Sequence, residues 1–172
     1  MEEVSLIQML DAREHRVHHQ QELLARYGKP LVCFTMNIAG PVKDTPLIRR
    51  GFARGRQLLE RQFLRCRWTP LYTDVSRAVT GCEAFYVLDA SPLEIKRLTT
   101  LVEDASPLGR LFDMDVLCPD GRKVDREELQ LEGRRCLLCG GPAKVCSSRR
   151  VHTVAALQEK TTEILTRPFT EL

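Results

Sequence analysis

The sequence predicts an α+β domain in which a small mixed or antiparallel sheet packs with helices. Helical and strand-like segments follow one another in a mixed order, without the strict alternation of a parallel α/β fold. The chain has 172 residues and suits a single domain, 1–172, able to bury roughly 70% of its unfolded surface. Hydrophobic residues make up 43% and charged residues 28%, which is ordinary for a globular protein.

A helix followed by a buried strand is predicted at the start of the chain. Apolar side chains recur every three to four positions over 5–27, which is typical of an amphipathic helix. Gly28 and Pro30 end this helix, because Gly caps helix C-termini and Pro cannot continue one. The segment 31–37 is apolar and partly β-branched, which predicts a buried strand before the break at Gly40.

A second helix, over about 45–66, is predicted to be strongly basic. Asp44 is its predicted cap, and Pro46 is tolerated in its first turn. Gly51 and Gly55 lie one turn apart, so they either weaken the helix or let another backbone approach closely. A solvated face is the simplest explanation of its arginines, which are Arg49, Arg50, Arg54, Arg56, Arg61, Arg65 and Arg67.

The remaining elements include a strand that carries two aspartates. Strands near 68–78 and 83–89 precede a helix that starts at Ser91 and ends near Asp104, with Pro and Glu in its first turn. The chain then continues with the aspartate strand 109–118, a turn over 119–122, a short return strand at 123–124 and a last helix over 153–165.

The two carboxylates of the predicted strand are Asp113 and Asp115. Side chains two positions apart on a strand point to the same face, so these like charges repel and need compensation. Water, a basic side chain or a metal ion can supply it. Asp-x-Asp on a strand can present oxygen ligands through which Mg²⁺ bridges to a polyphosphate, although edge strands also show charges to water.

Basic residues near this strand and before the basic helix are candidates for phosphate contacts. Gly109 and Arg110 stand at the start of this segment, immediately before its alternating residues, and can place a guanidinium beside a metal. Lys43 lies in a loop before the helix start, where backbone N–H groups with Arg49 and Arg50 can cradle an anion. The spacing of a P-loop is absent, and an ordinary turn and helix cap is the alternative.

A Cys/His-rich segment, 136–152, follows near the C-terminus. Cys136, Cys139, Cys146 and His152 are acceptable zinc ligands, but their spacing matches no common finger. Bound zinc, free thiols and a redox pair therefore stay open as alternatives. Flanking arginines can present positive charge to phosphates with or without a metal.

Composition narrows the partners and the compartment. The net charge of +3 is too small to indicate general nucleic-acid binding. No apolar run approaches the roughly 20 residues of a membrane helix, and no signal peptide is visible, so a cytoplasmic protein without disulfides is expected. The other cysteines are predicted to be small core residues: Cys33, Cys66, Cys82 and Cys118. The helical histidines are predicted to be solvated: His15, His18 and His19.

Three segments together resemble a known family. PLVCFTMNIAGPVKD, GRLFDMDV and RRCLLC…VC…H, in this order, resemble the apo-citrate lyase phosphoribosyl-dephospho-CoA transferases, also called holo-citrate lyase synthases. Ala39, where Pro is expected, and Cys33, where Ser is expected, depart mildly from the pattern. The resemblance implies a nucleotidyltransferase-like enzyme that attaches phosphoribosyl-dephospho-CoA, taken from triphosphoribosyl-dephospho-CoA, to a serine of the citrate lyase acyl-carrier (gamma) subunit and releases pyrophosphate.

The resemblance also implies roles for individual residues. Asp113 and Asp115 would be catalytic and hold Mg²⁺ against the triphosphate. Lys43 and Arg110 would contact phosphates, and the nucleophile would belong to the carrier. Two alternatives stay open: the equivalent transferase for the malonate decarboxylase carrier, and a non-catalytic zinc-containing interaction module built on the Cys/His-rich segment.

Overall fold

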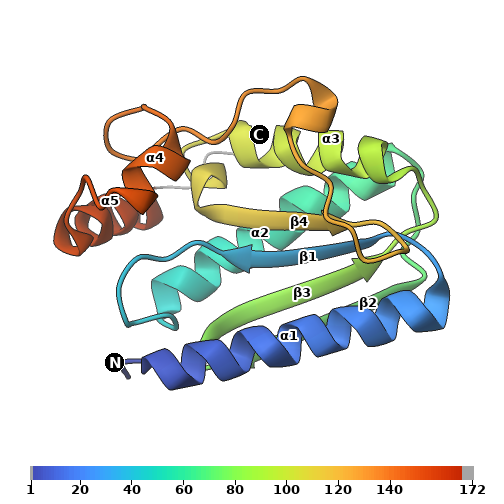
Figure 1. Ribbon diagram of the computed structural model, residues 1–172, viewed down its shortest axis with the longest axis horizontal. Coiled ribbons are helices and arrows are strands. Elements are labelled where there is room, and N and C mark those ends of the chain that lie inside the picture. Colours follow the sequence, from blue (N-terminus) through green and yellow to red (C-terminus); the bar gives the residue numbers. More distant parts are fainter. Residues whose placement is uncertain (1, 168–172) are drawn as a thin grey trace.

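The protein is described by a computed structural model over residues 2–167, and it is built around one four-stranded antiparallel sheet (Figure 1). The strand order is β2-β3-β1-β4. Helix α1 crosses one face of the sheet, α2 packs on the opposite face, and α3 lies along the outer side of β4. The elements are α1 (Leu6–Tyr27), β1 (Leu31–Met36), α2 (Pro46–Arg65), β2 (Tyr72–Ala78), β3 (Gly81–Val87), α3 (Pro92–Asp104), η1 (Gly109–Leu111), β4 (Phe112–Leu117), η2 (Glu127–Leu129), α4 (Ala143–Ser148) and α5 (Val154–Thr166).

The register of the sheet decides which side chains share a face. On β1, Cys33 pairs with Asp115 of β4 and Thr35 pairs with Asp113. Val32 and Phe34 alternate with them and enter the main core, between the sheet and helices α2 and α3. The aspartates therefore lie on the face of the sheet that α1 crosses.

Helix α1 forms over the residues that the sequence predicted, but its apolar side chains are only partly buried. Ser5 and Gln8 form a capping box at its start, and Gly28 ends it in the left-handed region with φ 59°. Leu23 and Leu24 pack on the sheet, whereas Leu6, at 75% exposure, and its neighbours in the first half face solvent. The sequence pattern showed the helix but not how much of it the sheet covers.

Helix α2 differs from the prediction at its cap and at its glycines. Thr45, not Asp44, caps the helix, because the Thr45 hydroxyl accepts the N–H of Ile48 at 3.2 Å. A Cβ on Gly55 would lie 2.5 Å from Cζ of Phe34, so this glycine makes room for an aromatic side chain of the core. Of the two alternatives given for the glycines, close approach is therefore correct at Gly55, but the group that approaches is a side chain and not a backbone.

Three further expectations are corrected. The aspartate strand begins at Phe112, because 109–111 form the 3₁₀ helix η1. The return strand reduces to an isolated bridge between Leu117 and Lys123. Cys66 is exposed, and Cys82 only half-buried, so neither is a full core residue.

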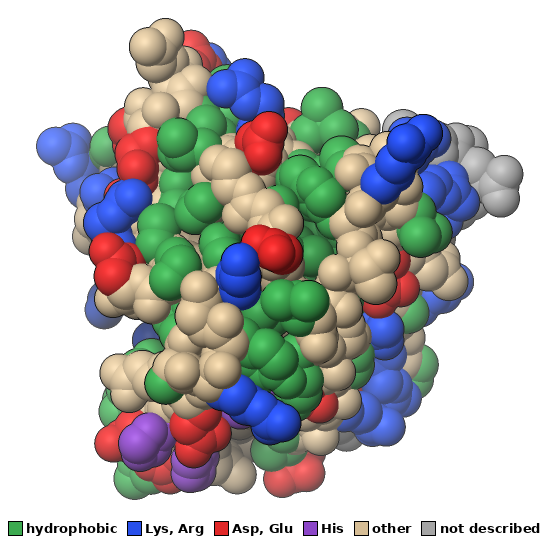
Figure 2. All heavy atoms as spheres, turned by 90° about the vertical axis from the view of Figure 1, so that its right-hand side faces the viewer, with side chains coloured by type: hydrophobic (Ala, Val, Ile, Leu, Met, Phe, Trp, Pro, Cys, Tyr) green, Lys and Arg blue, Asp and Glu red, His purple; other side chains and the backbone are tan. Residues whose placement is uncertain are grey.

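The histidines of α1 lie at the surface in the space-filling view, where side chains of both charges are interspersed (Figure 2). His19 departs from the prediction, since its ring packs edge-on against Phe85 at 4.7 Å and approaches Asp74 at 3.4 Å. Within residues 2–167, no helix has the length and apolarity that crossing a membrane requires.

Candidate active site and cysteine cluster

Asp113 and Asp115 project from β4 into an open cavity of about 640 Å³. Their neighbours Phe112, Met114 and Val116 are buried in the main core, so the strand alternates as an amphipathic strand should. The side chains of Asp113 and Asp115 are 46% and 32% exposed. Both carboxylates are therefore accessible from the same cavity.

Basic side chains compensate the pair. Nζ of Lys123 lies 2.6 Å from Oδ1 of Asp115, and Nη1 of Arg134 lies 3.9 Å from Oδ1 of Asp113. Burial, and then the charge of Asp115, raise the pKa of Asp113, while Arg134 acts in the opposite direction. The repulsion that the sequence predicted is thus only partly relieved at Asp113.

Side chains of α3 hold the strand between the two aspartates. Glu103 accepts the backbone N–H of Met114 at 2.8 Å, and Nζ of Lys96 donates to the Met114 carbonyl at 3.3 Å. Glu103 and Lys96 are only 3% and 5% exposed. Because β4 is an edge strand, these contacts satisfy backbone groups that another strand would otherwise pair. Sequence reasoning missed both residues, whose only signal is their seven-residue spacing, which places them on one face of α3 together with Thr99 and Thr100.

Glu103 also joins this strand to the basic side of the cavity. Its carboxylate lies 2.7 Å from Arg126 and 2.7 Å from Arg134. Arg134 in turn donates to the Phe112 carbonyl and approaches Asp113. One buried carboxylate therefore fixes a guanidinium next to the exposed aspartate.

The residues predicted to contact phosphate are not all near the aspartates. Lys43 is near, since it lines a second cavity that Asp113 also lines. Arg49 pairs instead with Asp44 at 3.1 Å, and Nη2 of Arg50 donates to the Leu165 carbonyl at 2.7 Å. Neither arginine lines the two cavities that contain Asp113.

Gly109 and Arg110 lie in η1, and neither lines the two cavities that contain Asp113. A Cβ on Gly109 would lie 2.6 Å from the carbonyl oxygens of Val102 and Glu103, so only glycine lets η1 pack against the end of α3. The Arg110 guanidinium donates to the Arg135 carbonyl. It lines a third cavity, of about 610 Å³, together with residues of the Cys/His-rich segment.

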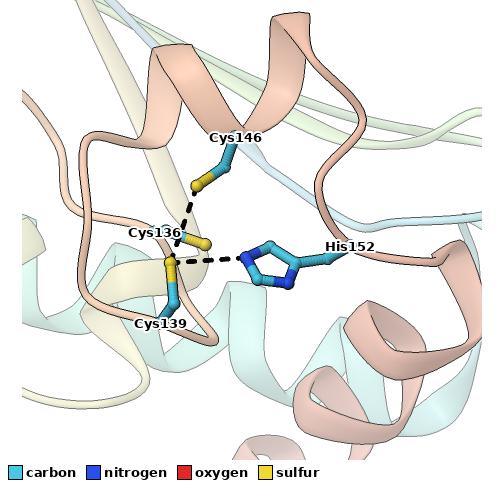
Figure 3. Close-up of side chains that lie close together, drawn as sticks. All are labelled: Cys136, Cys139, Cys146 and His152. Carbon is cyan, nitrogen blue, oxygen red and sulfur yellow. Dashed lines mark hydrogen bonds between the residues drawn. The ribbon is translucent and has the colours of Figure 1, made fainter.

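The structure brings Cys136, Cys139, Cys146 and His152 together, as the zinc alternative of the sequence analysis requires (Figure 3). Their ligand atoms all lie within 4.8 Å of one another. Sγ of Cys139 lies 3.6 Å from Sγ of Cys146 and 3.3 Å from Nε2 of His152. Ligands of a tetrahedral zinc ion with bonds of about 2.3 Å to sulfur are separated by about 3.8 Å, and the distances from Cys139 to Cys146 and His152 are close to this value.

A tight loop holds the first two cysteines. Gly140 adopts φ 71° and its N–H donates to the Cys136 carbonyl at 3.1 Å. Burial opposes ionisation of the Cys136 thiol, but backbone N–H groups of Cys139 and Leu138 directed at it lower its pKa to about 7. A thiol with this pKa readily becomes the thiolate that binds a metal.

Paired carboxylates that face lysine and arginine across an open cavity are typical of enzymes that transfer phosphate-linked groups. Comparison with known proteins agrees, and it places the chain among transferases. The chain belongs to the family of apo-citrate lyase phosphoribosyl-dephospho-CoA transferases, with residues 4–167 matched.

Similar proteins carry related names. A probable apo-citrate lyase phosphoribosyl-dephospho-CoA transferase of Vibrio cholerae serotype O1 is 38% identical over 94% of this chain and 91% of its own length. A transferase of the same name from Citrobacter koseri is 35% identical over 90% of this chain and 84% of its own length. The Haemophilus influenzae protein CitXG is 33% identical over 91% of this chain but only 34% of its own length, so the match is one part of a longer chain.

Proposed function

We propose that this chain transfers phosphoribosyl-dephospho-CoA from triphosphoribosyl-dephospho-CoA to a serine of the citrate lyase acyl-carrier (gamma) subunit, with release of pyrophosphate. Family membership supports the reaction. The observation that supports the site is that Asp113 and Asp115 lie side by side in an open cavity that Lys123 and Arg134 also line. The serine comes from the carrier, which fits a cavity open enough for a protein segment to enter.

The two aspartates suit Mg²⁺. Both offer carboxylate oxygens from one face, and the raised pKa of Asp113 marks a carboxylate whose charge is incompletely neutralised. Bound there, Mg²⁺ would neutralise charge on the triphosphate as pyrophosphate leaves. Arg134, held by Glu103, keeps a guanidinium beside Asp113 where a phosphate oxygen can accept from it.

In this proposal the other residues predicted to contact phosphate bind different parts of the donor. Lys43 contacts the triphosphate, because it shares a cavity with Asp113. Arg110 contacts phosphates of the dephospho-CoA part, because neither aspartate lines its cavity, which adjoins theirs at Arg134 and Arg135 and also contains Arg150. Arg49 and Arg50 contribute less to phosphate binding, since Arg49 is paired with Asp44 and Arg50 donates to the Leu165 carbonyl.

The Cys/His cluster is proposed to hold a structural zinc ion. Three cysteines and one histidine make a closed four-ligand set, which is typical of structural sites. The cluster forms one wall of the cavity that contains Arg110. In this role it shapes the donor site without taking part in the chemistry.

The reaction is tested by incubating purified protein, Mg²⁺ and triphosphoribosyl-dephospho-CoA with the apo-carrier subunit and measuring the intact mass of the carrier. A mass gain equal to the prosthetic group is expected with the wild type and is expected to be absent with Asp113→Asn or Asp115→Asn. A gain only on the malonate decarboxylase carrier would move the chain to that reaction. No gain on either carrier would contradict the transferase function.

A further inference from the structure

A small polar cavity of about 140 Å³ adjoins Asp113, and neither Asp115 nor Lys123 lines it. Its lining residues come mainly from the first half of α1, the loop after β1 and the turn from β2 to β3. These segments lie at the left of Figure 1. The N–H of Val4 donates to the Pro41 carbonyl at 2.9 Å, which ties the start of α1 to that loop. Asp113 forms part of the wall of this cavity and of the larger one.

Three cations converge on this cavity. Arg13 and Arg16 are three residues apart on α1 and so share a helix face, and Lys43 reaches in from the loop. Arg16 is paired with Glu83 at 2.6 Å. Lys43 donates to the Ile38 carbonyl, and within residues 2–167 Arg13 has no hydrogen-bond or ion-pair partner.

Arg13, Arg16 and Lys43 outnumber by one the two carboxylates of the wall, Glu83 and Asp113, and an anion would relieve this excess of positive charge. Burial, and then the charge of Arg13, lower the pKa of Lys43. Thr35, Asn37 and Thr80 also line the cavity and add polar groups that can donate to oxygen. The volume is well below the 300–1,000 Å³ typical of sites for drug-sized ligands, so a compact anion suits it better than a nucleotide.

We propose that this cavity binds the terminal pyrophosphate part of the donor's triphosphate, with Arg13 and Lys43 as direct contacts. The inference rests on the proposed function and assigns the leaving group a site of its own. As the serine oxygen bonds to the α-phosphorus, the bond from that phosphorus to the bridging oxygen breaks. The electron pair stays on the released pyrophosphate, and the serine proton is released to solvent. Arg13 and Lys43 face the charge that develops on the leaving group.

The position of Asp113 between two cavities supports this assignment. Displacement at phosphorus requires the attacking and leaving oxygens to lie roughly in line. The larger cavity is open and has room for the carrier serine, whereas the small one is narrow and basic. A phosphorus atom next to Asp113 would thus have the entering oxygen on one side and the leaving pyrophosphate on the other.

The inference is tested by calorimetric titration of the protein with inorganic pyrophosphate in the presence of Mg²⁺. Arg13→Ala and Lys43→Met are each expected to weaken binding about tenfold or more, because each removes a charge-assisted contact. Arg26→Ala is the matched control, an exposed arginine on the same helix that lines none of these cavities, and is expected to bind like the wild type. In transfer assays Arg13→Ala should raise KM for the donor and leave KM for the carrier unchanged.

The outcomes separate this inference from the proposed function. Equal pyrophosphate affinity in the wild type, Arg13→Ala and Lys43→Met would overturn the assignment, as would absence of binding by a wild type that modifies the carrier. Binding that depends on Arg13, without any transfer to the citrate lyase carrier, would uphold the cavity and overturn the proposed reaction. Unchanged circular dichroism and melting temperature of Arg13→Ala would show that its effect is local.

Discussion

Glu103 of α3 accepts the backbone N–H of Met114 at 2.8 Å, and this contact fixes the strand segment between Asp113 and Asp115. Met114 itself is fully buried on the opposite face of the sheet. The backbone that carries the two aspartates is therefore held from the core on one face and from α3 at its edge. A buried carboxylate is tolerated there because Arg126 and Arg134 neutralise it.

Replacing Glu103 by Gln is expected to lower the free energy of unfolding by about 2–4 kcal/mol. Gln can keep the contact with the Met114 N–H but leaves Arg126 and Arg134 without their buried counter-charge. Urea unfolding followed by circular dichroism measures the change. Asp104→Asn is the control, because the Asp104 carboxylate also pairs with Arg126 but is half-exposed. This substitution should lower the free energy of unfolding by less than about 1 kcal/mol. Equal losses in the two variants would contradict the role of Glu103.

Asp113→Asn is expected to abolish transfer while making the metal-free protein slightly more stable. Burial and Asp115 raise the pKa of Asp113 above its unfolded value. Its contribution to stability is therefore present at low pH and is lost as pH rises through the folded pKa, so the ionised form opposes folding at neutral pH. Because the Asp113 side chain is 46% exposed, the substitution should raise the free energy of unfolding by no more than about 1 kcal/mol. This corresponds to roughly 2–4 °C in Tm.

Thermal melts of the metal-free protein at neutral pH and near pH 4 check this sign. The stabilisation by Asp113→Asn should be larger at neutral pH and shrink on acidification, as the wild-type carboxyl becomes protonated. Asp11→Asn, an exposed substitution on α1, is expected to change Tm little at either pH. A lower Tm for Asp113→Asn at neutral pH would show that the interaction with Arg134 outweighs burial and the charge of Asp115.

Gly55→Ala is expected to destabilise the protein by about 1–3 kcal/mol, although Ala is the better helix former. The added Cβ would lie 2.5 Å from Phe34 and 2.9 Å from Phe112, two aromatic side chains fixed in the main core. Denaturant unfolding measures the loss. Gly133→Ala, where no atom lies within 4 Å of the added Cβ, should fall within about 0.5 kcal/mol of the wild type.

Much of the fold and part of the site could be predicted from the sequence, because many signals are local. Gly28 at a helix end and Pro46 in a first turn act through their own backbone conformation. The roles of Lys96 and Glu103 depend on which strand lies at the sheet edge, and no local pattern reveals that. The cavity that Arg110 lines could not be predicted for a similar reason, since the 3₁₀ turn beside the strand directs this side chain into a cavity that the aspartates do not line.

Cys139→Ser is expected to abolish zinc binding, with about one zinc ion per chain measured in the wild type and none in the variant. Sγ of Cys139 lies within 3.6 Å of both Cys146 and His152, so its loss opens the ligand set. Cys66→Ser is the control, because Cys66 is exposed and lies outside the cluster, and it should retain the metal. Equal zinc content in the wild type and Cys139→Ser would remove the proposed metal site.

Loss of the metal should also loosen the segment around α4 before it affects the sheet. Helix α4 has only six residues and none of them is buried, so neither its length nor its packing makes it stable alone. Its attachment depends on Cys146, which would be bonded through zinc to the loop of Cys136 and Cys139. Hydrogen exchange after chelation should therefore accelerate over 136–152 while β1 and β4 stay protected. Uniform protection of both regions would show that the cluster does not hold this segment through a metal.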